Sequence, residues 1–527
     1  MAKNFSLWIK KNYILLFIIL LSFLVRVVPS HLETFSADEG VTLYHAQKSV
    51  IHNIIWPFFD DYVPFYHILL SLWLKIATLS IFSSRFLSVL FGTVSVFLLY
   101  LIVEKLFNKK TATYSSLIFA LSPFAIFYSQ EVRVYSLYLL LGLLSIYFYL
   151  VYIKKGKYKW SYIITTILAI YTHGMALLIP FFQTIHFIFQ EVWIKKRSFK
   201  DWLFIQLIIF VFFLPLIYFV VQESLKFASG KIIWVPPPSI IGIIKFFYLY
   251  VAGMTFLLPN LIVGMAISII FFILIGYAII NFFYKKNKDS SRIEKESVIF
   301  LLAWFIIPII GLIIYSTLFS SVFIEKYIIF VSPVISILVS LGIIKLKGIT
   351  KNVVVVSIII LLALAVCFDI VSKNNPNWTG ASDYIKEKKS PNDVIIMSFY
   401  NVQYTFSYYF NKTIFQSENI TLYLEKNSMY SANDHSNLNT NTLKNNDIWL
   451  VLHASEYTDP NATVYTYFTS NYNLAEYKKF TGVSVYHFSK SSKKTVQPPT
   501  DYRAPQYNDD RLIEFKAFVK KVLGMKN

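Results

Sequence analysis

Residues 13–47 read YILLFIILLSFLVRVVPSHLETFSADEGVTLYHAQ, an apolar stretch that is soon followed by two adjacent carboxylates, Asp38 and Glu39. The apolar part is long enough to cross the hydrocarbon core of a bilayer as a helix. Similar stretches recur along the chain to about residue 371. The sequence therefore predicts a polytopic α-helical membrane protein, and it raises the question of why two acids stand where the chain leaves the membrane.

The composition indicates the same class. Of 527 residues, 56% are hydrophobic and 15% are charged, which is too apolar for a soluble protein of this length. The net charge of +20 does not indicate nucleic acid, because Lys and Arg cluster in short loops between apolar stretches, as the positive-inside rule expects. We therefore expect membrane lipid, and no nucleic acid, among the partners. The single cysteine excludes an intramolecular disulfide and a cysteine-based metal site.

The distribution of basic loops predicts the topology. The N-terminal lysines place the N-terminus in the cytoplasm, and the first helix reads as a retained signal-anchor. Keeping every basic loop inside gives about 11 spans of a multi-pass cell-membrane protein. Two successive cytoplasmic loops must be joined by an even number of crossings. This condition is met only if the apolar stretches 65–80 and 239–259 do not cross, so we expect them to be interfacial or re-entrant.

The chain divides by composition near residue 371. Residues 1–371 form the predicted membrane domain, whose outer loop 30–84 carries the acidic pair. Beyond it, DVIIMSFY (393–400) and DIWLVLHA (447–454) predict buried strands and TGASDYIKEKK (379–389) predicts a helix. We therefore expect a small extracytoplasmic α/β domain over residues 372–490.

Residues 491–527 differ in composition from the two predicted domains. Residues 491–510 are rich in Ser, Lys and Pro and predict a linker. Residues 511–527 predict a basic amphipathic helix, which suits either a membrane surface or ordinary packing.

Ionisable residues near spans mark function, because each is costly unless it pairs or lines a cavity. Under the predicted topology a scattered set falls at the outer ends of spans or in the first outer loop: Asp38, Glu39, Asp60, Asp61, Glu131, Arg133, His173, Glu325 and Lys326. We expect this set to converge on one external site. Its carboxylates can act as general base or metal ligand, and Arg133, Lys326 and Arg85 can hold a phosphate. Such chemistry suits the breaking of a bond between a lipid phosphate and its cargo.

The same stretches carry a family resemblance. RVVPSHLETFSADEGVTLYHAQ (26–47) resembles the first outer loop of the GT-C glycosyltransferases, and ALSPFAIFYSQEVRVYSLYLLLGLLS (120–145) is similar to their L-S-P-x-x-x-x-Y-S-Q-E-A-R-x-Y segment. YTHGMALLIPFFQ (171–183) resembles their next outer turn. Within that fold the chain looks most like the dolichyl-phosphate-mannose protein mannosyltransferase and lipid A aminoarabinose transferase group, especially its RgtA/B/C/D-like branch.

The resemblance implies a GT-C-like fold and an inverting transfer of a hexose or pentose. The donor would be a polyprenyl-phosphate sugar, and the acceptor a hydroxyl of a protein, lipid or polysaccharide at the outer membrane face. It implies Asp38 as the general base with Glu39 in support, and an aromatic residue after the pair, here Tyr44. It also implies Glu131 and Arg133 as donor-site residues, with His173 as a polar wall of the site.

Two positions depart from the family pattern. Tyr62-Val63-Pro64 stands where the family usually has His-Pro-Pro or Lys-Pro-Pro, and Lys326-Tyr327 stands where it often has Arg-Tyr. Lysine keeps the positive charge but lacks the bidentate fork of arginine, so we expect a looser phosphate contact. The acidic residues leave open whether a divalent metal takes part.

Other interpretations of these residues stay open. Asp38 could be a loop or N-cap acid, Arg133 could pair with Glu131, His173 could be an ordinary polar residue and Lys326 could snorkel. A lipid-linked-sugar transporter or flippase would be insensitive to Asp38→Asn. A polymerase or ligase with a lipid-diphosphate donor would reject monophosphate carriers.

Overall fold

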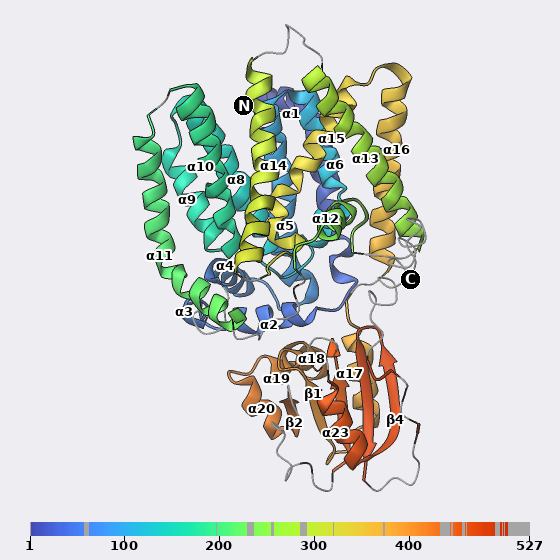
Figure 1. The fold of residues 1–527 in the computed structure, drawn as a ribbon. Helices are drawn as coiled ribbons and strands as arrows, with labels where there is room; N and C mark the ends of the chain where they lie inside the picture. The colour runs from blue at the N-terminus through green and yellow to red at the C-terminus, as the bar shows by residue number, and fades with distance from the viewer. Residues whose placement is uncertain are drawn as a thin grey trace. The chain divides into compact units, whose positions relative to one another are not determined.

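The computed structural model describes most of the chain (Figure 1). The described residues are 2–56, 63–196, 198–228, 237–254, 258–284, 292–319, 321–372, 375–432, 446–455 and 461–490, with positions 235, 443, 459, 496, 497, 499 and 501–503. Asp60, Asp61, Tyr62 and the amphipathic helix expected at 511–527 lie outside these residues, as does most of the linker at 491–510.

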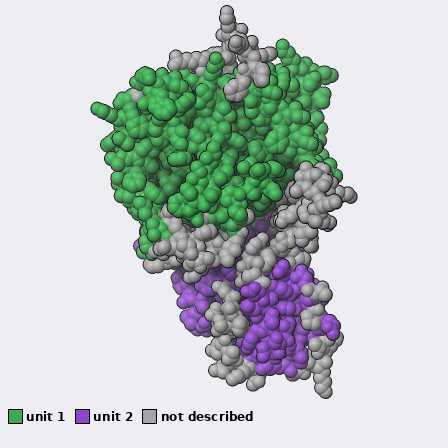
Figure 2. Space-filling view, viewed as in Figure 1, with its two compact units in different colours: residues 1–30, 53–73, 82–372 green, residues 31–52, 74–81, 373–527 purple. Residues whose placement is uncertain are grey.

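The chain divides into two compact units, coloured separately in Figure 2. Unit 1 comprises residues 1–30, 53–73 and 82–372, and unit 2 comprises 31–52, 74–81 and 373–527. The segment with the acidic pair thus belongs to the C-terminal unit, whereas the sequence predicts a simple division near residue 371. The packing of this segment, described below, gives the reason.

Unit 1 is helical throughout its described residues. Its longer helices are α1 (Ala2–Val27), α5 (Ile81–Leu106), α8 (Tyr135–Lys155), α11 (Lys200–Ala228), α13 (Leu258–Tyr284), α14 (Arg292–Leu318) and α16 (Gly348–Val371). Its shorter elements are α4 (Pro64–Leu74), α6 (Lys109–Ala120), α7 (Pro123–Phe127), α9 (Lys159–Ile170), η3 (Gly174–Leu177), α10 (Leu178–His186), η4 (Phe187–Ile194), α12 (Ile240–Ala252), η5 (Glu325–Val331) and α15 (Pro333–Lys345). Within the unit α8 packs along α9, α10 packs on α14, and α15 packs on both α6 and α13.

Eight helical segments among the described residues are long and apolar enough to cross a membrane. They are Asn12–His31, Ile81–Leu106, Tyr135–Lys155, Gly174–Ile194, Lys200–Tyr218, Asn260–Phe282, Lys295–Leu318 and Gly348–Val371. A ninth span results if η5 and α15, which meet at 49°, form one broken span. The polytopic helical fold is therefore confirmed, but the predicted count of about 11 spans is not.

Short helices account for the difference in span count. α6 and α9 lie in the stretches 111–127 and 161–173, which the count of about 11 spans includes, yet each helix has 12 residues. Such a helix is about 18 Å long, against a hydrocarbon core of about 30 Å. α4 and α12, with 11 and 13 residues, are also too short to span. This agrees with the prediction that the stretches 65–80 and 239–259 do not cross.

Unit 2 contains a five-stranded sheet in the order β2-β1-β3-β5-β4. The strands are β1 (Val394–Ser398), β2 (Met429–Ala432), β3 (Ile448–Leu452), β4 (Asn473–Phe480) and β5 (Val483–Ser489). β1 pairs in parallel with β2 and β3, while β5 runs antiparallel to β3 and β4. Every residue of β1 and β3 is buried, as expected of continuous apolar strands inside a parallel pair.

The chain segments before, between and after these strands form helices. They are α17 (Trp378–Lys388), α18 (Val402–Phe410), α19 (Lys412–Phe415), α20 (Ile420–Lys426) and α23 (Thr463–Asn471). β1, β3 and α17 fall where the sequence predicts two strands and a helix, so the small C-terminal α/β domain is confirmed. Unit 2 also includes α2 (Ala37–Ala46), which carries the acidic pair and packs against α18.

Candidate active site

The two members of the acidic pair have different environments in the first turn of α2. Ser36 is the N-cap: its Oγ accepts a hydrogen bond from the Glu39 amide at 3.3 Å, and Glu39 Oε2 accepts one from the Ser36 amide at 2.8 Å. This reciprocal arrangement is a capping box, which satisfies two backbone amides at the start of the helix. Glu39 is fully buried, whereas Asp38 is exposed. The solvent-facing carboxylate of the pair is therefore that of Asp38.

The glycine after the pair brings α2 into close contact with α18. A Cβ at Gly40 would lie within 3 Å of the side chain and backbone of Thr405. The Thr405 hydroxyl hydrogen-bonds the Ser36 and Ala37 carbonyls at 3.1 and 3.2 Å. This packing explains why the segment that follows the first span belongs to unit 2.

His453 in unit 2 lies within electrostatic range of Asp38. Burial lowers the pKa of His453, while the Gly482 carbonyl and the Asp38 carboxylate act in the opposite direction. His453 Nδ1 lies 2.7 Å from the Gly482 carbonyl, so this nitrogen donates and carries a proton. Because burial keeps the imidazole neutral, His453 adds no positive charge near Asp38.

Tyr44, the aromatic residue after the pair, is buried within unit 2 and links α2 to α20. Its hydroxyl donates to the Glu418 carbonyl at 3.1 Å and accepts from the Ile420 amide at 3.0 Å. These bonds tie α2 to the N-terminus of α20. Lys48 Nζ lies 4.4 Å from the centre of the Tyr44 ring, a cation–π contact that reinforces the same junction.

Unit 1 brings together residues that are far apart in the sequence around His173. The His173 ring stacks on Tyr138, with centroids 4.9 Å apart and planes 11° apart, and its Nδ1 accepts from the Met175 amide at 3.1 Å. Lys326 Nζ lies 5.1 Å from the centre of the Tyr135 ring. Burial, then Lys326, then Arg133 lower the pKa of His173 to about 3. His173 is therefore neutral, with two cations within electrostatic range.

Two acids lie near the same group. Burial raises the pKa of Tyr128 well above its ordinary value, and Glu325 and Glu131 add to this effect. Glu325 forms an ion pair with Lys245 of α12, with Oε1 and Nζ 3.4 Å apart. Glu131, Arg133, His173 and Lys326 are hereafter called the Arg133–Lys326 cluster. Of the nine residues expected to converge on one site, the structure brings these four, with Glu325, near one another inside unit 1.

The residues before Glu131 hold this cluster against α1. Arg26 is fully buried and donates from Nε to Ser129 Oγ at 3.3 Å and from Nη1 to the Ala120 carbonyl at 3.0 Å. Gln130 Nε2 in turn donates to the Arg26 carbonyl at 2.9 Å. The serine and glutamine of the Ser-Gln-Glu-x-Arg stretch therefore position the loop, and the later residues belong to the cluster.

Two further residues of unit 1 bear on this region. Arg85 is buried and donates from Nη1 to the Ser30 carbonyl at 2.9 Å, so it holds the end of the first helix. His67 of α4 is buried against Trp56, with ring centroids 5.4 Å apart. Burial and then Arg133 lower the pKa of His67 to about 3, which places His67 within range of the cluster.

Sequence reasoning missed both His67 and His453. His67 lies in a mainly apolar stretch, and a single histidine there carries no pattern. The signal for His453 was its position directly after a buried parallel strand, where functional groups gather in α/β sheets. Among the described residues no three His, Cys, Asp or Glu side chains are grouped so as to hold a metal ion.

The chain is similar to a known protein family and to several solved structures. Residues 61–219 match the family described as dolichyl-phosphate-mannose-protein mannosyltransferase. Comparison with curated protein sequences gives no match. ArnT from Cupriavidus metallidurans bound to undecaprenyl phosphate aligns with a TM-score of 0.52 at 12% identity, over 92% of this chain and 99% of that chain. The archaeal oligosaccharyltransferase AglB from Archaeoglobus fulgidus, in complex with an inhibitory peptide and a dolichol-phosphate, aligns with a TM-score of 0.54 at 12% identity, over 93% and 75%.

The chain has the GT-C fold. The resemblance to the GT-C glycosyltransferases is thereby confirmed. Apo ArnT from the same organism aligns equally well, with a TM-score of 0.54 at 11% identity over 92% of this chain and 99% of that chain. The family match of this GT-C protein includes Arg85, Glu131, Arg133 and His173. It excludes Asp38, whose assignment therefore depends on the α2 geometry and on the motif.

Proposed function

We propose that this GT-C protein transfers a sugar from a polyprenyl-phosphate carrier to an acceptor hydroxyl at the outer membrane face, with inversion at the anomeric carbon. The observation that carries the proposal is the α2 turn, in which Glu39 caps the helix and leaves Asp38 as the exposed carboxylate. The lipid phosphates bound by ArnT and AglB support a donor of the same class here.

Asp38 is the proposed general base. Its carboxylate takes the proton of the acceptor hydroxyl as the oxygen attacks the anomeric carbon from the side opposite the phosphate. The bond from carbon to phosphate oxygen breaks, its electron pair leaves with the polyprenyl phosphate, and the configuration inverts. A positioned base of this kind contributes about 10²–10⁴-fold to the rate. The N-terminal position on α2 stabilises the ionised form that this role needs.

The Arg133–Lys326 cluster is the proposed phosphate site. Arg133 can bind two phosphate oxygens through its fork, and Lys326 adds a second positive charge. His173 accepts at Nδ1 from the Met175 amide, so its neutral ring carries the proton on Nε2 and can donate there. These donors would stabilise the negative charge that develops as the phosphate departs.

The test is sugar transfer by the full-length protein in vesicles. Labelled hexoses and pentoses would be supplied on polyprenyl monophosphate and on polyprenyl diphosphate, with peptide, lipid and polysaccharide acceptors. The matched control for Asp38→Asn is Asp383→Asn, which makes the same change at an exposed acid of α17 that pairs with Lys386. We expect wild type and the control to release polyprenyl phosphate, and Asp38→Asn to lose this activity.

Three other results would contradict the proposal. Turnover of Asp38→Asn at the wild-type rate would remove Asp38 as the base. Turnover with diphosphate carriers alone would identify a different donor class. Movement of intact donor between leaflets, without cleavage, would identify a transporter.

A further inference from the structure

Lys326 of the Arg133–Lys326 cluster lies over the ring of Tyr135, the first residue of α8. Its Nζ is 5.1 Å from the ring centre, within the distance of about 6 Å at which an aromatic face attracts a cation. Tyr135 ends the Ser-Gln-Glu-x-Arg-x-Tyr stretch at 129–135. The stretch that supplies Glu131 and Arg133 to the cluster therefore also supplies a ring for Lys326.

The Tyr135 ring is held in place by its neighbours. Tyr135 is 3% exposed, and its ring contacts those of Tyr128 and His173, with centroids 5.2 and 6.0 Å apart. The planes of the Tyr128 and Tyr135 rings are 69° apart, an edge-to-face geometry that aromatic pairs favour. Tyr128 is itself buried. The ring face that Lys326 meets is therefore oriented by this packing and does not depend on Lys326.

The backbone around Lys326 is anchored to the same helix. The Tyr138 hydroxyl of α8 donates to the Tyr327 carbonyl of η5 at 3.2 Å. A Cβ at Gly142 of α8 would lie 3.1 Å from the Cβ of Phe330, so η5 packs directly against α8 there as well. Because the backbone of η5 is fixed on α8 in this way, the part of Lys326 that can still move is its long side chain.

A lysine side chain binds phosphate as a point charge on a flexible stem. The stem has many rotamers, and the loss of their freedom opposes binding. Arginine loses less freedom for each hydrogen bond, because its planar fork is already ordered. A contact that orders the ammonium group before the phosphate arrives lowers this cost for lysine. The Tyr135 ring provides such a contact.

The ring leaves the ammonium group of Lys326 able to bind a phosphate. An ammonium group has three N–H donors, and an aromatic face occupies only one side of it. Lys326 and Arg133 both lie within electrostatic range of His173. The two cations are therefore close enough to act together on one anion.

We propose that Tyr135 is a positioning residue for the donor phosphate: its ring holds the Lys326 ammonium group, by a cation–π contact, where that group meets the phosphate. The inference rests on the proposed function, in which Lys326 contacts the phosphate. Tyr135 itself does not touch the phosphate and acts only through Lys326. Phosphate binding should therefore depend on the negative potential of the ring face at position 135 and not on the hydroxyl group of the tyrosine.

The test is binding of polyprenyl phosphate by the full-length protein in detergent, measured by native mass spectrometry. Tyr135→Phe keeps the ring face and should bind like wild type. Tyr135→Leu removes the ring, and we expect it to bind about tenfold more weakly, as loss of a desolvated cation–π contact predicts. A trifluorinated phenylalanine at position 135 keeps nearly the same shape but loses most of the negative potential, so it should bind almost as weakly as Tyr135→Leu.

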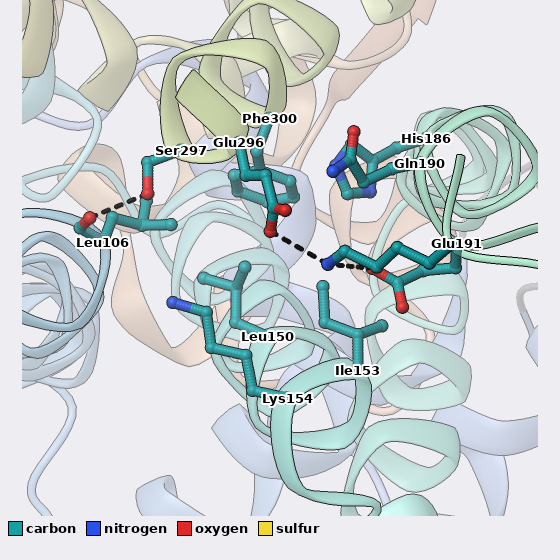
Figure 3. Close-up of a pocket in the computed structure, with 11 residues that line it drawn as sticks. Leu106, Leu150, Ile153, Lys154, His186, Gln190, Glu191, Glu296, Ser297 and Phe300 are labelled. Atoms are coloured by element: carbon teal, nitrogen blue, oxygen red, sulfur yellow. Dashed lines mark hydrogen bonds and ion pairs between the residues drawn. The ribbon is translucent and has the colours of Figure 1, made fainter. Parts of the chain in front are cut away.

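The matched control is Tyr147→Leu, near the other end of α8. Lys105 Nζ lies 5.3 Å from the centre of the Tyr147 ring, so this variant removes the same kind of contact from the same helix. The two tyrosines are separated by about 18 Å of helix. The far end of α8 lines a separate cavity of about 350 Å³, to which it contributes Leu150 and Lys154 (Figure 3). We expect Tyr147→Leu to bind polyprenyl phosphate like wild type.

A double variant shows whether the ring acts through the lysine. If Tyr135 works only by holding Lys326, then Tyr135→Leu combined with Lys326→Gln should bind no more weakly than Lys326→Gln alone. A general loss of structure at the start of α8 would instead add to the loss from Lys326→Gln. Unfolding temperatures of all variants are measured beside binding. The comparison of phenylalanine with its trifluorinated form remains decisive if Tyr135→Leu folds poorly.

Several results would overturn the proposal. Binding of Tyr135→Leu at the wild-type level would remove the role of the ring, and so would equal binding by phenylalanine and its trifluorinated form. Additive losses in the double variant would show that Tyr135 does not act through Lys326. These results leave the proposed function standing. Wild-type protein that does not bind polyprenyl phosphate, or Lys326→Gln that binds it like wild type, would instead contradict the proposed phosphate site and this inference with it.

Discussion

Gly40 of α2 and Thr405 of α18 approach so closely that a Cβ on Gly40 would overlap Thr405 Oγ1 and lie 2.8 Å from the Thr405 backbone nitrogen. No rotation of the threonine side chain relieves the contact with the backbone. The contact therefore fixes α2 on the C-terminal unit, and with it the position of Asp38 within that unit.

Gly40→Ala should destabilise unit 2. Because the added methyl group must displace the backbone of α18, we expect a loss of about 1–3 kcal/mol. Thermal unfolding of the purified protein, followed by limited proteolysis of unit 2, measures the effect. Gly276→Ala is the matched control, since a Cβ there meets nothing within 4 Å. An unchanged unfolding temperature for Gly40→Ala would contradict the close packing.

Glu39 should tolerate glutamine but not alanine. Glutamine preserves the reciprocal hydrogen bond of the capping box, whereas alanine removes it at a cost of about 1 kcal/mol. We therefore expect Glu39→Gln to retain sugar transfer and Glu39→Ala to lower the unfolding temperature. Transfer rates and unfolding temperatures of both variants give the answer. If Glu39→Gln were as inactive as Asp38→Asn, Glu39 would have a direct chemical role.

A fall in pH below 6.5 should destabilise unit 1, because His67 takes up a proton more readily in the unfolded chain than in the folded protein. Its pKa is about 3 in the folded protein, below the ordinary value of 6.5, so the unfolded chain binds more protons between these two values. The contribution of His67 to the free energy of unfolding is fully present above about pH 6.5. It falls as the pH drops, by about 2 kcal/mol at pH 5. Unfolding temperatures of wild type and His67→Phe at pH 7 and pH 5 test this. The variant keeps an aromatic ring against Trp56 and should lose part of the pH dependence; an identical dependence would exclude His67 as a source.

Lys326 should affect the donor rather than the acceptor. Loss of one charged phosphate contact in Lys326→Gln predicts a fall in kcat/KM for the donor of about 10–100-fold. Lys326→Arg should retain activity, because it keeps the charge and adds a fork. Lys110→Gln, at an exposed lysine of α6, is the control. A change confined to the acceptor KM would argue against a phosphate contact.

Much of this architecture could be predicted from the sequence because its signals are local. Apolar length gave the spans, and two apolar strands gave the C-terminal sheet. The capping position of Glu39 was also accessible, since Ser36 and Glu39 have the spacing of a capping box. The number of spans was harder to predict from the sequence, because apolar character does not reveal that α6 and α9 end after 12 residues.

Contacts between distant segments could not be predicted in the same way. His453 acquires its relation to Asp38 only through the packing of α2 on the C-terminal unit. The π-helical turn at Phe187–Ile194, which carries Gln190 and Glu191, has no recognised sequence signal. These features depend on tertiary structure, which a single sequence does not encode in a readable local pattern.

The buried Arg26 has a consequence for the order of synthesis. Within α1 its guanidinium reaches only Ser22, and its other acceptors are the Ala120 carbonyl and the Ser129 hydroxyl. A nascent chain that has not yet reached these residues presents a charged side chain to the bilayer without its final partners, which is unfavourable. The first helix therefore cannot reach its mature environment when it is inserted, and its assembly must wait until the segment from α6 to Ser129 has left the ribosome.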